Sequence, residues 1–176
     1  MRKSKAIFTI GYSNMEIGAF IKRLQHFDID TLIDIRTIPR SRHQPYFNAD
    51  RLAKRLSENG ISYEHWGSLT GLRKPNGDPR GAAWINASFR GFADYMQTNE
   101  FRDAIIKLIK HSHRHKIVLM CAEGNPFRCH RRLIADALYA RGIKAFHIQS
   151  STTAKEHTLT AFAKVYRKRV MYPVAT

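Results

Sequence analysis

Hydrophobic residues along the chain form short continuous runs that alternate with stretches of helical spacing. The short segments at residues 6–10, 31–35, 61–66, 116–120 and 143–148 predict strands. Between them, apolar residues recur three and four positions apart, which predicts helices that bury one face. Alternation of this kind indicates an α/β fold. We expect a three-layer, Rossmann-like domain with a mostly parallel sheet of about five strands, joined by right-handed crossovers.

Capping and turn residues place the ends of the predicted helices. Ser13, with Glu16 three positions later, forms a capping-box pair ahead of an apolar stripe. Pro126 suits the first turn of a later helix, which Gly142 would end. The helices are expected at residues 17–27, 48–60, 89–96, 101–111 and 126–141.

Two segments lack a regular pattern. Residues 67–87 are rich in glycine and proline, and so long a loop within a compact domain is usually functional or mobile. We interpret this loop as a lid over the functional site. Residues 151–176 follow the domain at residues 1–150 and form a basic tail, for which a helix around residues 159–166 is one alternative.

Charge and composition narrow the function. Lys and Arg number 30 against 14 Asp and Glu, and the net charge of +16 favours an anionic partner such as nucleic acid or a nucleotide. The apolar stretch near the N-terminus is too short for a signal peptide, and no run is long enough to span a membrane. The two cysteines are expected as reduced thiols. These features favour a cytoplasmic protein without a membrane partner.

Side chains that follow the predicted strands are candidates for function, because ligands bind parallel sheets at the carboxyl ends of the strands. These candidates are Thr9, Gly11, Ser13, Asp34, Arg36, Cys121 and Glu123. The densest group continues to the expected start of a helix, where Arg128, Cys129, His130 and Arg131 follow one another. Free N–H groups and positive charge at a helix start lower the pKa of a thiol and suit an anion.

These residues divide into predicted roles. Cys121 is the expected nucleophile, with His130 or Glu123 as its proton-transfer partner. The groups expected to hold the anion are Arg36, Arg128, Arg131 and Ser13. The residues expected to support the site are Thr9, Gly11, Asp34 and Cys129. Nothing in the sequence requires a cofactor.

Several motifs occur in a fixed order along the chain. They are Thr9-Ile-Gly-Tyr-Ser-Asn14, Asp34-Ile-Arg36 with Pro39-Arg-Ser41, and Cys121-Ala-Glu123 with Pro126 and Cys129-His-Arg131. By these motifs the chain resembles the bacterial and archaeal family called domain of unknown function 488, over about residues 7–148. The family name carries no established reaction. The resemblance therefore implies the fold and the place of the site, and leaves the activity open.

Three hypotheses remain open at this point. The first, which we favour, is a thiol-dependent enzyme that acts on an anionic substrate. The second is a zinc or iron site whose ligands would be Cys121, Glu123, Cys129 and His130. The third is a non-catalytic module that binds nucleic acid through positive charge and aromatic side chains. Structural interpretations exist as well: Cys129 as a small core residue, and Asp34 with Arg36 as an ion pair.

Overall fold

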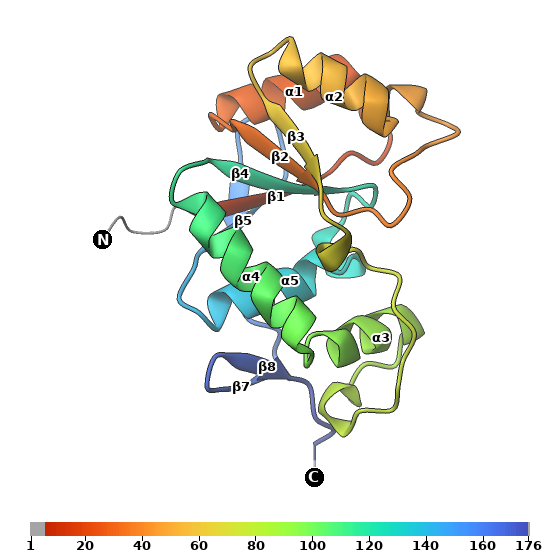
Figure 1. The fold of residues 1–176 in the computed structure, drawn as a ribbon, viewed down its shortest axis with the longest axis vertical. Coiled ribbons are helices and arrows are strands. Elements are labelled where there is room, and N and C mark those ends of the chain that lie inside the picture. Colours follow the sequence, from red (N-terminus) through yellow and green to blue (C-terminus); the bar gives the residue numbers. More distant parts are fainter. Residues whose placement is uncertain (1–5, 176) are drawn as a thin grey trace.

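A six-stranded sheet runs through the centre of the computed structural model, which describes residues 6–175 (Figure 1). In order across the sheet, the strands are β3 (Ser62–His65), β2 (Thr31–Asp34), β4 (Ile117–Cys121), β1 (Ile7–Gly11), β5 (Ala145–Ile148) and β6 (Ala154–Glu156). The first five in this order are mutually parallel, and β6 pairs antiparallel with β5. The predicted α/β fold with a mostly parallel sheet is confirmed.

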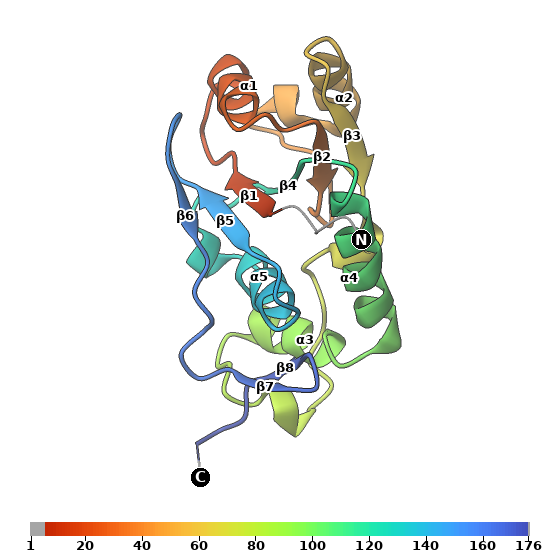
Figure 2. The same cartoon turned by 90° about the vertical axis from the view of Figure 1, so that its left-hand side faces the viewer.

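Helices cover both faces of the sheet and complete the three layers (Figures 1 and 2). One face carries α1 (Ile17–His26) and α2 (Ala49–Ser57), and the other carries α3 (Ala87–Tyr95), α4 (Asn99–Ser112) and α5 (Arg131–Tyr139). Among residues 6–175, no helix has the length and apolar character needed to cross a membrane.

Two apolar clusters, one on each side of the sheet, hold the layers together. Side chains on β4 alternate between them, since successive residues of a strand point to opposite faces. Val118 and Met120 join the cluster that contains Phe20 of α1, whereas Leu119 joins the one that contains Leu133 of α5. All five side chains are fully buried, and each burial contributes roughly 1.5–3 kcal/mol. The central strands therefore hold the loops and side chains at their carboxyl ends in fixed positions.

The capping-box prediction at Ser13 is wrong. α1 begins at Ile17, with Glu16 at the N-cap position and no side-chain cap. Ser13 lies in the preceding turn with φ 45°, a left-handed conformation, and its amide donates to the Ala122 carbonyl at 2.8 Å. This bond ties the loop after β1 to the loop after β4, so a contact between distant segments overrides the local capping signal.

The last predicted helix is interrupted near its start. One 3-10 turn covers Pro126–Arg128, and α5 begins only at Arg131. Between them, Cys129 has an extended backbone with φ −131° and ψ 149°, and His130 occupies the N-cap position of α5. The Asn125 side chain accepts an amide hydrogen from the short turn and stabilises it separately. The cysteine and the histidine therefore stand ahead of the helix and not in its first turn.

The C-terminal segment forms strands, and the helix considered for residues 159–166 is not present there. After β6, the strands β7 (Lys164–Tyr166) and β8 (Arg169–Met171) form a hairpin. Tyr172 is fully buried and donates its hydroxyl to Asp136 Oδ2 at 2.7 Å. The segment predicted as a tail thus packs against α5. Strands of three residues are too short to give a periodic signal in the sequence.

Candidate functional site

The carboxyl ends of β1 and β4 lie side by side at the centre of the site. Gly11 at the end of β1 is in register with Cys121 at the end of β4, where the sequence placed this cysteine. A Cβ atom on Gly11 would lie 1.8 Å from the Glu123 carbonyl oxygen and 2.7 Å from Arg131 Nη2. Only glycine fits at this position, because the loop after β4 folds directly across the end of β1.

Two thiols and one imidazole converge at this edge of the sheet. The Sγ atoms of Cys121 and Cys129 and a ring nitrogen of His130 all lie within 4.8 Å of one another. Cys129 Sγ lies 3.6 Å from His130 Nδ1 and accepts a hydrogen bond from Arg131 Nε at 3.4 Å. A guanidinium only donates, so the sulfur is the acceptor in that bond. The cysteine that was predicted only to support the site is therefore the more strongly polarised of the two.

The two thiols differ in how readily they ionise. A hydrogen bond from Cys121 holds the pKa of Cys129 well below its ordinary value of 9.0, and His130 and Arg131 lower it further against the opposing effect of burial. The same contact and burial raise the pKa of the Cys121 thiol. The pair titrates as a unit, with the negative charge on Cys129 and the proton kept by Cys121.

His130 is oriented from behind by the loop at residues 67–87. Its Nε2 atom lies 3.0 Å from the Leu69 carbonyl oxygen, which can only accept, so Nε2 carries a hydrogen and Nδ1 faces Cys129. A Cβ atom on Gly71 would lie 2.5 Å from His130 Nδ1. The backbone at Gly71 therefore packs directly on the imidazole, and this is the part of the predicted lid that reaches the site.

A cavity of about 340 Å³ opens beside the two thiols and His130. Its walls include two exposed cations, Arg40 and Arg128, whose guanidinium groups donate no hydrogen bond within residues 6–175. Leu72 and Phe89 add apolar surface to the same cavity. Positive charge beside apolar surface suits an anionic ligand that also carries a flat or apolar group.

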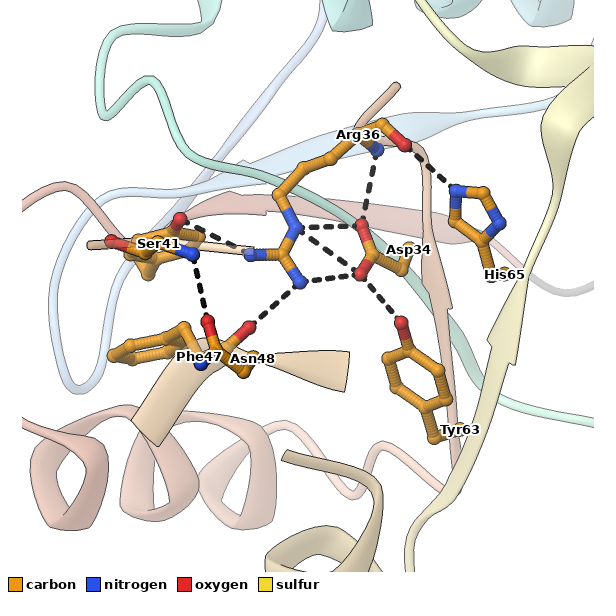
Figure 3. A network of polar contacts seen from close by, with 8 residues as sticks. Asp34, Arg36, Ser41, Phe47, Asn48, Tyr63 and His65 are labelled. Atoms are coloured by element: carbon orange, nitrogen blue, oxygen red, sulfur yellow. Dashed lines mark hydrogen bonds and ion pairs between the residues drawn. The ribbon is translucent and has the colours of Figure 1, made fainter. Parts of the chain in front are cut away.

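Arg36 lies beside this cavity, but its guanidinium is bound within the protein (Figure 3). It forms a bidentate ion pair with Asp34, with a shortest contact of 2.6 Å, and donates to the Phe47 carbonyl at 2.8 Å. Asp34 also accepts the Tyr63 hydroxyl at 2.7 Å. Because Arg36 is only 5% exposed and fully engaged, the geometry matches the structural ion pair and not the predicted anion-binding role.

Arg131 is also turned inward and is only 1% exposed. Besides its bond to Cys129, it donates from Nη1 to Thr9 Oγ1 at 3.3 Å and from Nη2 to the carbonyls of Glu123 and Gly124. This geometry favours a supporting role for Arg131 over the predicted direct contact with an anion. The guanidinium instead holds the loop after β4 in place and polarises the cysteine sulfur.

A buried chain of hydrogen bonds extends from Thr9 toward the C-terminal segment. Thr9 Oγ1 lies 2.7 Å from His147 Nδ1, and His147 Nε2 lies 2.9 Å from His157 Nδ1. His157 Nε2 in turn lies 2.8 Å from Asp136 Oδ1. An ionised carboxylate only accepts, so His157 donates from Nε2 to Asp136; with both imidazoles neutral, His147 in turn donates from Nε2 to His157 and the Thr9 hydroxyl donates to His147. A lone pair of the Thr9 oxygen is then free to accept Arg131.

Two other predicted residues stand outside the group of thiols and imidazole. Glu123 lines the cavity, but its carboxylate accepts the Asn125 amide at 2.9 Å and does not join the group formed by the cysteines and His130. Ser13 is exposed and does not line the cavity. Ser13 is therefore not placed to act on a ligand held beside the sulfur atoms, whereas Glu123 adds one negative charge to the cavity wall.

Sequence reasoning missed three residues of the site and its support. Arg40 lines the cavity and stands inside one of the quoted motifs, so the motif contained it. Asp136 is a single carboxylate within an apolar helical stretch, and such a residue requires buried partners. His157, one of those partners, lies in the segment that was interpreted as a solvated tail, and its sequence context gave no signal.

A metal ion is a second use for the same side chains. Within residues 6–175, Cys121, Cys129 and His130 are the group whose atoms could hold one, and Glu123 of the predicted set is not among them. Two thiolates and an imidazole suit zinc, and the adjoining cavity leaves room for a fourth ligand. The hydrogen bond from His130 Nε2 to a backbone carbonyl is typical of metal-binding histidines.

Comparisons with known proteins bear on the family and not on the activity. No curated protein and no solved structure matches the chain. The model of the family described as "Domain of unknown function DUF488" matches residues 16–138, more than half of the chain, and this stretch includes both cysteines and His130. The family inferred from the sequence motifs is confirmed, and the chain belongs to the DUF488 family.

Proposed function

We propose that the protein is a thiol-dependent enzyme whose nucleophile is Cys129 and whose substrate is anionic, with nucleic acid or a nucleotide as the favoured class. The observation that carries this proposal is the hydrogen bond from Arg131 Nε to Cys129 Sγ, beside His130 and at the wall of the cavity. A guanidinium and an imidazole directed at one sulfur stabilise the thiolate, which is the reactive form of cysteine. The nucleophilic role predicted for Cys121 thus passes to Cys129.

The arrangement supports distinct roles for the three central side chains. The Cys129 thiolate attacks an electrophilic centre held in the cavity and forms a covalent bond to it. His130 Nδ1, 3.6 Å from the sulfur, is placed to take the thiol proton as the thiolate forms and to return it to the group that departs when its bond to the electrophilic centre breaks. Cys121 keeps its proton and donates to the thiolate in the resting state, which limits premature reaction.

The choice of an anionic substrate is supported by charge. Arg40 and Arg128 line the cavity and are exposed, so they can form ion pairs with a ligand at little cost to the fold. The net charge of +16 would also attract a polyanion to the surface from a distance. Gly71 and Leu72 place the loop at residues 67–87 against the cavity, consistent with its proposed role as a lid.

The rate of alkylation by iodoacetamide, measured against pH, tests the thiolate. At pH 7 the wild-type protein should react about threefold faster than a free cysteine, because a larger fraction is ionised although each thiolate is less nucleophilic. Cys121→Ser keeps a hydrogen-bond donor beside the sulfur and should retain the fast reaction, whereas Cys129→Ser should lose it. Fast reaction in Cys129→Ser, or ordinary cysteine rates in both variants, would contradict the proposal.

A metal centre is the second candidate function for this site. The bond between His130 Nε2 and the Leu69 carbonyl favours it, because it directs the lone pair of Nδ1 toward the sulfur atoms. Elemental analysis of protein purified without chelators or an affinity tag distinguishes the two candidates. Stoichiometric zinc or iron that disappears in His130→Gln would support the metal centre, and its absence from the wild-type protein would remove this candidate.

A further inference from the structure

A second cavity, of about 70 Å³, lies between the start of α4, the end of α5 and the turn of the β7–β8 hairpin. We call it the hairpin pocket. Five of its lining residues are cations: Arg102, Arg141, Arg167, Lys168 and Arg169. No acidic side chain lines it, and among these cations only Arg102 has a carboxylate partner within residues 6–175, the exposed Asp103 at 3.0 Å. In Figures 1 and 2 the hairpin lies below α5.

Arg141 is the central cation of the hairpin pocket. It is half-buried, and its Nη1 atom donates to the carbonyls of Ala137 and Lys168 at 3.1 and 2.8 Å. No residue in the described part of the chain accepts a hydrogen bond from its Nε or Nη2 atoms. Burial and the nearby charge of Arg169 lower the pKa of Arg141. A guanidinium in this state is stabilised by an anion that reaches its unused donors.

The residues of the hairpin turn are a second indication that the hairpin pocket needs positive charge. Its two central residues, Arg167 and Lys168, have φ angles of 47° and 65°, the left-handed region that a two-residue turn of this type requires. Asn-Gly is the pair that such a turn favours, because longer side chains are strained there. Two cations thus occupy strained positions at the mouth of a pocket that is already positive, which indicates a role for their charge.

The start of α4 also contributes positive electrostatic potential to the hairpin pocket. Thr98, the N-cap residue of this helix, lines the hairpin pocket. The first N–H groups of a helix and its dipole present partial positive charge at that end. Three separate elements, α4, α5 and the β7–β8 hairpin, therefore direct positive charge at one small volume.

We propose that the hairpin pocket binds a single tetrahedral oxyanion, in the protein a phosphoryl group. Its volume exceeds the about 10–15 Å³ that one water needs and is too small for a nucleobase. Arginine pairs well with phosphate oxygens through two parallel hydrogen bonds, which the free Nε and Nη2 of Arg141 can supply. The pocket lies at the opposite end of α5 from Cys129, so this site is separate from the proposed catalytic cavity.

Thermal unfolding with inorganic phosphate as the probe tests this proposal. At equal ionic strength, phosphate in tenfold excess over its Kd should raise the wild-type midpoint by about 3 °C relative to chloride. The double variant Arg167→Asn with Lys168→Gly gives the turn its preferred residues while it removes two cations. It should therefore unfold at a higher temperature in chloride and lose most of the phosphate shift.

A matched control removes the same two residue types elsewhere. Lys110→Gln with Arg114→Gln, both exposed at the other end of α4, should keep the full shift. A full shift in the hairpin variant would overturn the proposal. A shift that is lost only in Arg40→Gln with Arg128→Gln would also overturn it, because the phosphate would then bind in the cavity beside Cys129. Arg141→Gln should lose the shift as the hairpin variant does.

An oligonucleotide arm identifies the source of the phosphoryl group. If the source is a nucleic-acid backbone, the hairpin variant should bind a single-stranded oligonucleotide several-fold more weakly than the matched control. If both bind it equally while the phosphate shift is lost only in the hairpin variant, the source is a small phosphorylated compound. Either result supports the pocket, and neither depends on whether Cys129 is a nucleophile.

Discussion

At the scale of single residues, the site depends on Gly11, where the loop after β4 leaves no space for a side chain. Gly11→Ala would place a Cβ atom 1.8 Å from the Glu123 carbonyl oxygen, so the loop and Arg131 must move. We expect this variant to lower the free energy of unfolding by about 3 kcal/mol, measured with urea. Gly18→Ala is the control, because nothing lies within 4 Å of its Cβ and it should be neutral or stabilising. Equal effects would contradict the close approach.

A second prediction at this scale concerns the pH dependence of stability. Burial, the neighbouring His157 and the charge of Arg131 lower the pKa of His147 from 6.5 to about 3. The unfolded chain then binds a proton at this residue near pH 6.5, while the folded protein does not. His147 therefore stabilises the fold fully above pH 6.5, and this contribution is lost as the pH falls toward 3.

The pH range from 7 to 5 separates this effect from that of the carboxylates. Over it, the free energy of unfolding should fall by about 2 kcal/mol through His147 alone, since Asp and Glu titrate mainly below this range. Urea unfolding at both pH values gives the difference. His147→Gln removes the titrating group and should flatten the dependence, and an unchanged dependence in this variant would show that other groups cause it.

At the scale of elements, the buried hydrogen-bond chain connects α5 and the C-terminal segment to β1. Asp136 sets its direction, because only an ionised carboxylate accepts from His157 without ambiguity. In Asp136→Asn the amide can donate or accept, so the direction of the chain is no longer fixed and Thr9 Oγ1 can become an acceptor shared by His147 and Arg131, which loosens the hold on the guanidinium. The pKa of Cys129 should rise by half a unit or more, which moves the midpoint of the alkylation profile to higher pH by the same amount.

A control separates this effect from simple loss of stability. Tyr172→Phe removes the hydroxyl that bonds Asp136 Oδ2 but leaves the carboxylate and its bond to His157 intact. It should destabilise the fold while the alkylation profile stays where it is in the wild-type protein. If Asp136→Asn also unfolds more easily yet keeps that profile, the chain is purely structural.

Among the elements, the sequence predicted the central strands but not the interruption of the helix near the site. The central strands β1, β2 and β4 were recognisable because each is largely buried within the sheet and is mostly apolar, and the position of Cys121 follows from the end of β4. The meeting of the two thiols was not predictable, since it requires the helix to stop at Arg128 and restart at Arg131. Local residue preferences favour one continuous helix there, and long-range packing decides otherwise.

At the scale of the whole molecule, the charge of +16 is distributed unevenly between bound and free groups. The sequence positions of Arg36 and Arg131 predicted that they bind the anion. Both are buried, however, and their guanidinium groups form hydrogen bonds within the protein. Arg40 and Arg128, which stand in irregular segments, remain available at the cavity. Net charge therefore predicts the class of partner, but only the fold shows which cations can reach it.

Salt dependence tests whether these available cations contact a polyanion. A single-stranded oligonucleotide should bind the wild-type protein more weakly as salt increases, with a log–log slope of about 0.7 for each phosphate contact. Arg40→Gln with Arg128→Gln removes two such contacts and should reduce the slope by about 1.4, measured by fluorescence anisotropy. Lys110→Gln with Arg114→Gln carries the same loss of charge away from the cavity and should leave the slope nearly unchanged. Binding that does not depend on salt would exclude phosphate contacts, and equal losses in both double variants would mean that attraction is diffuse and that no strand enters the cavity.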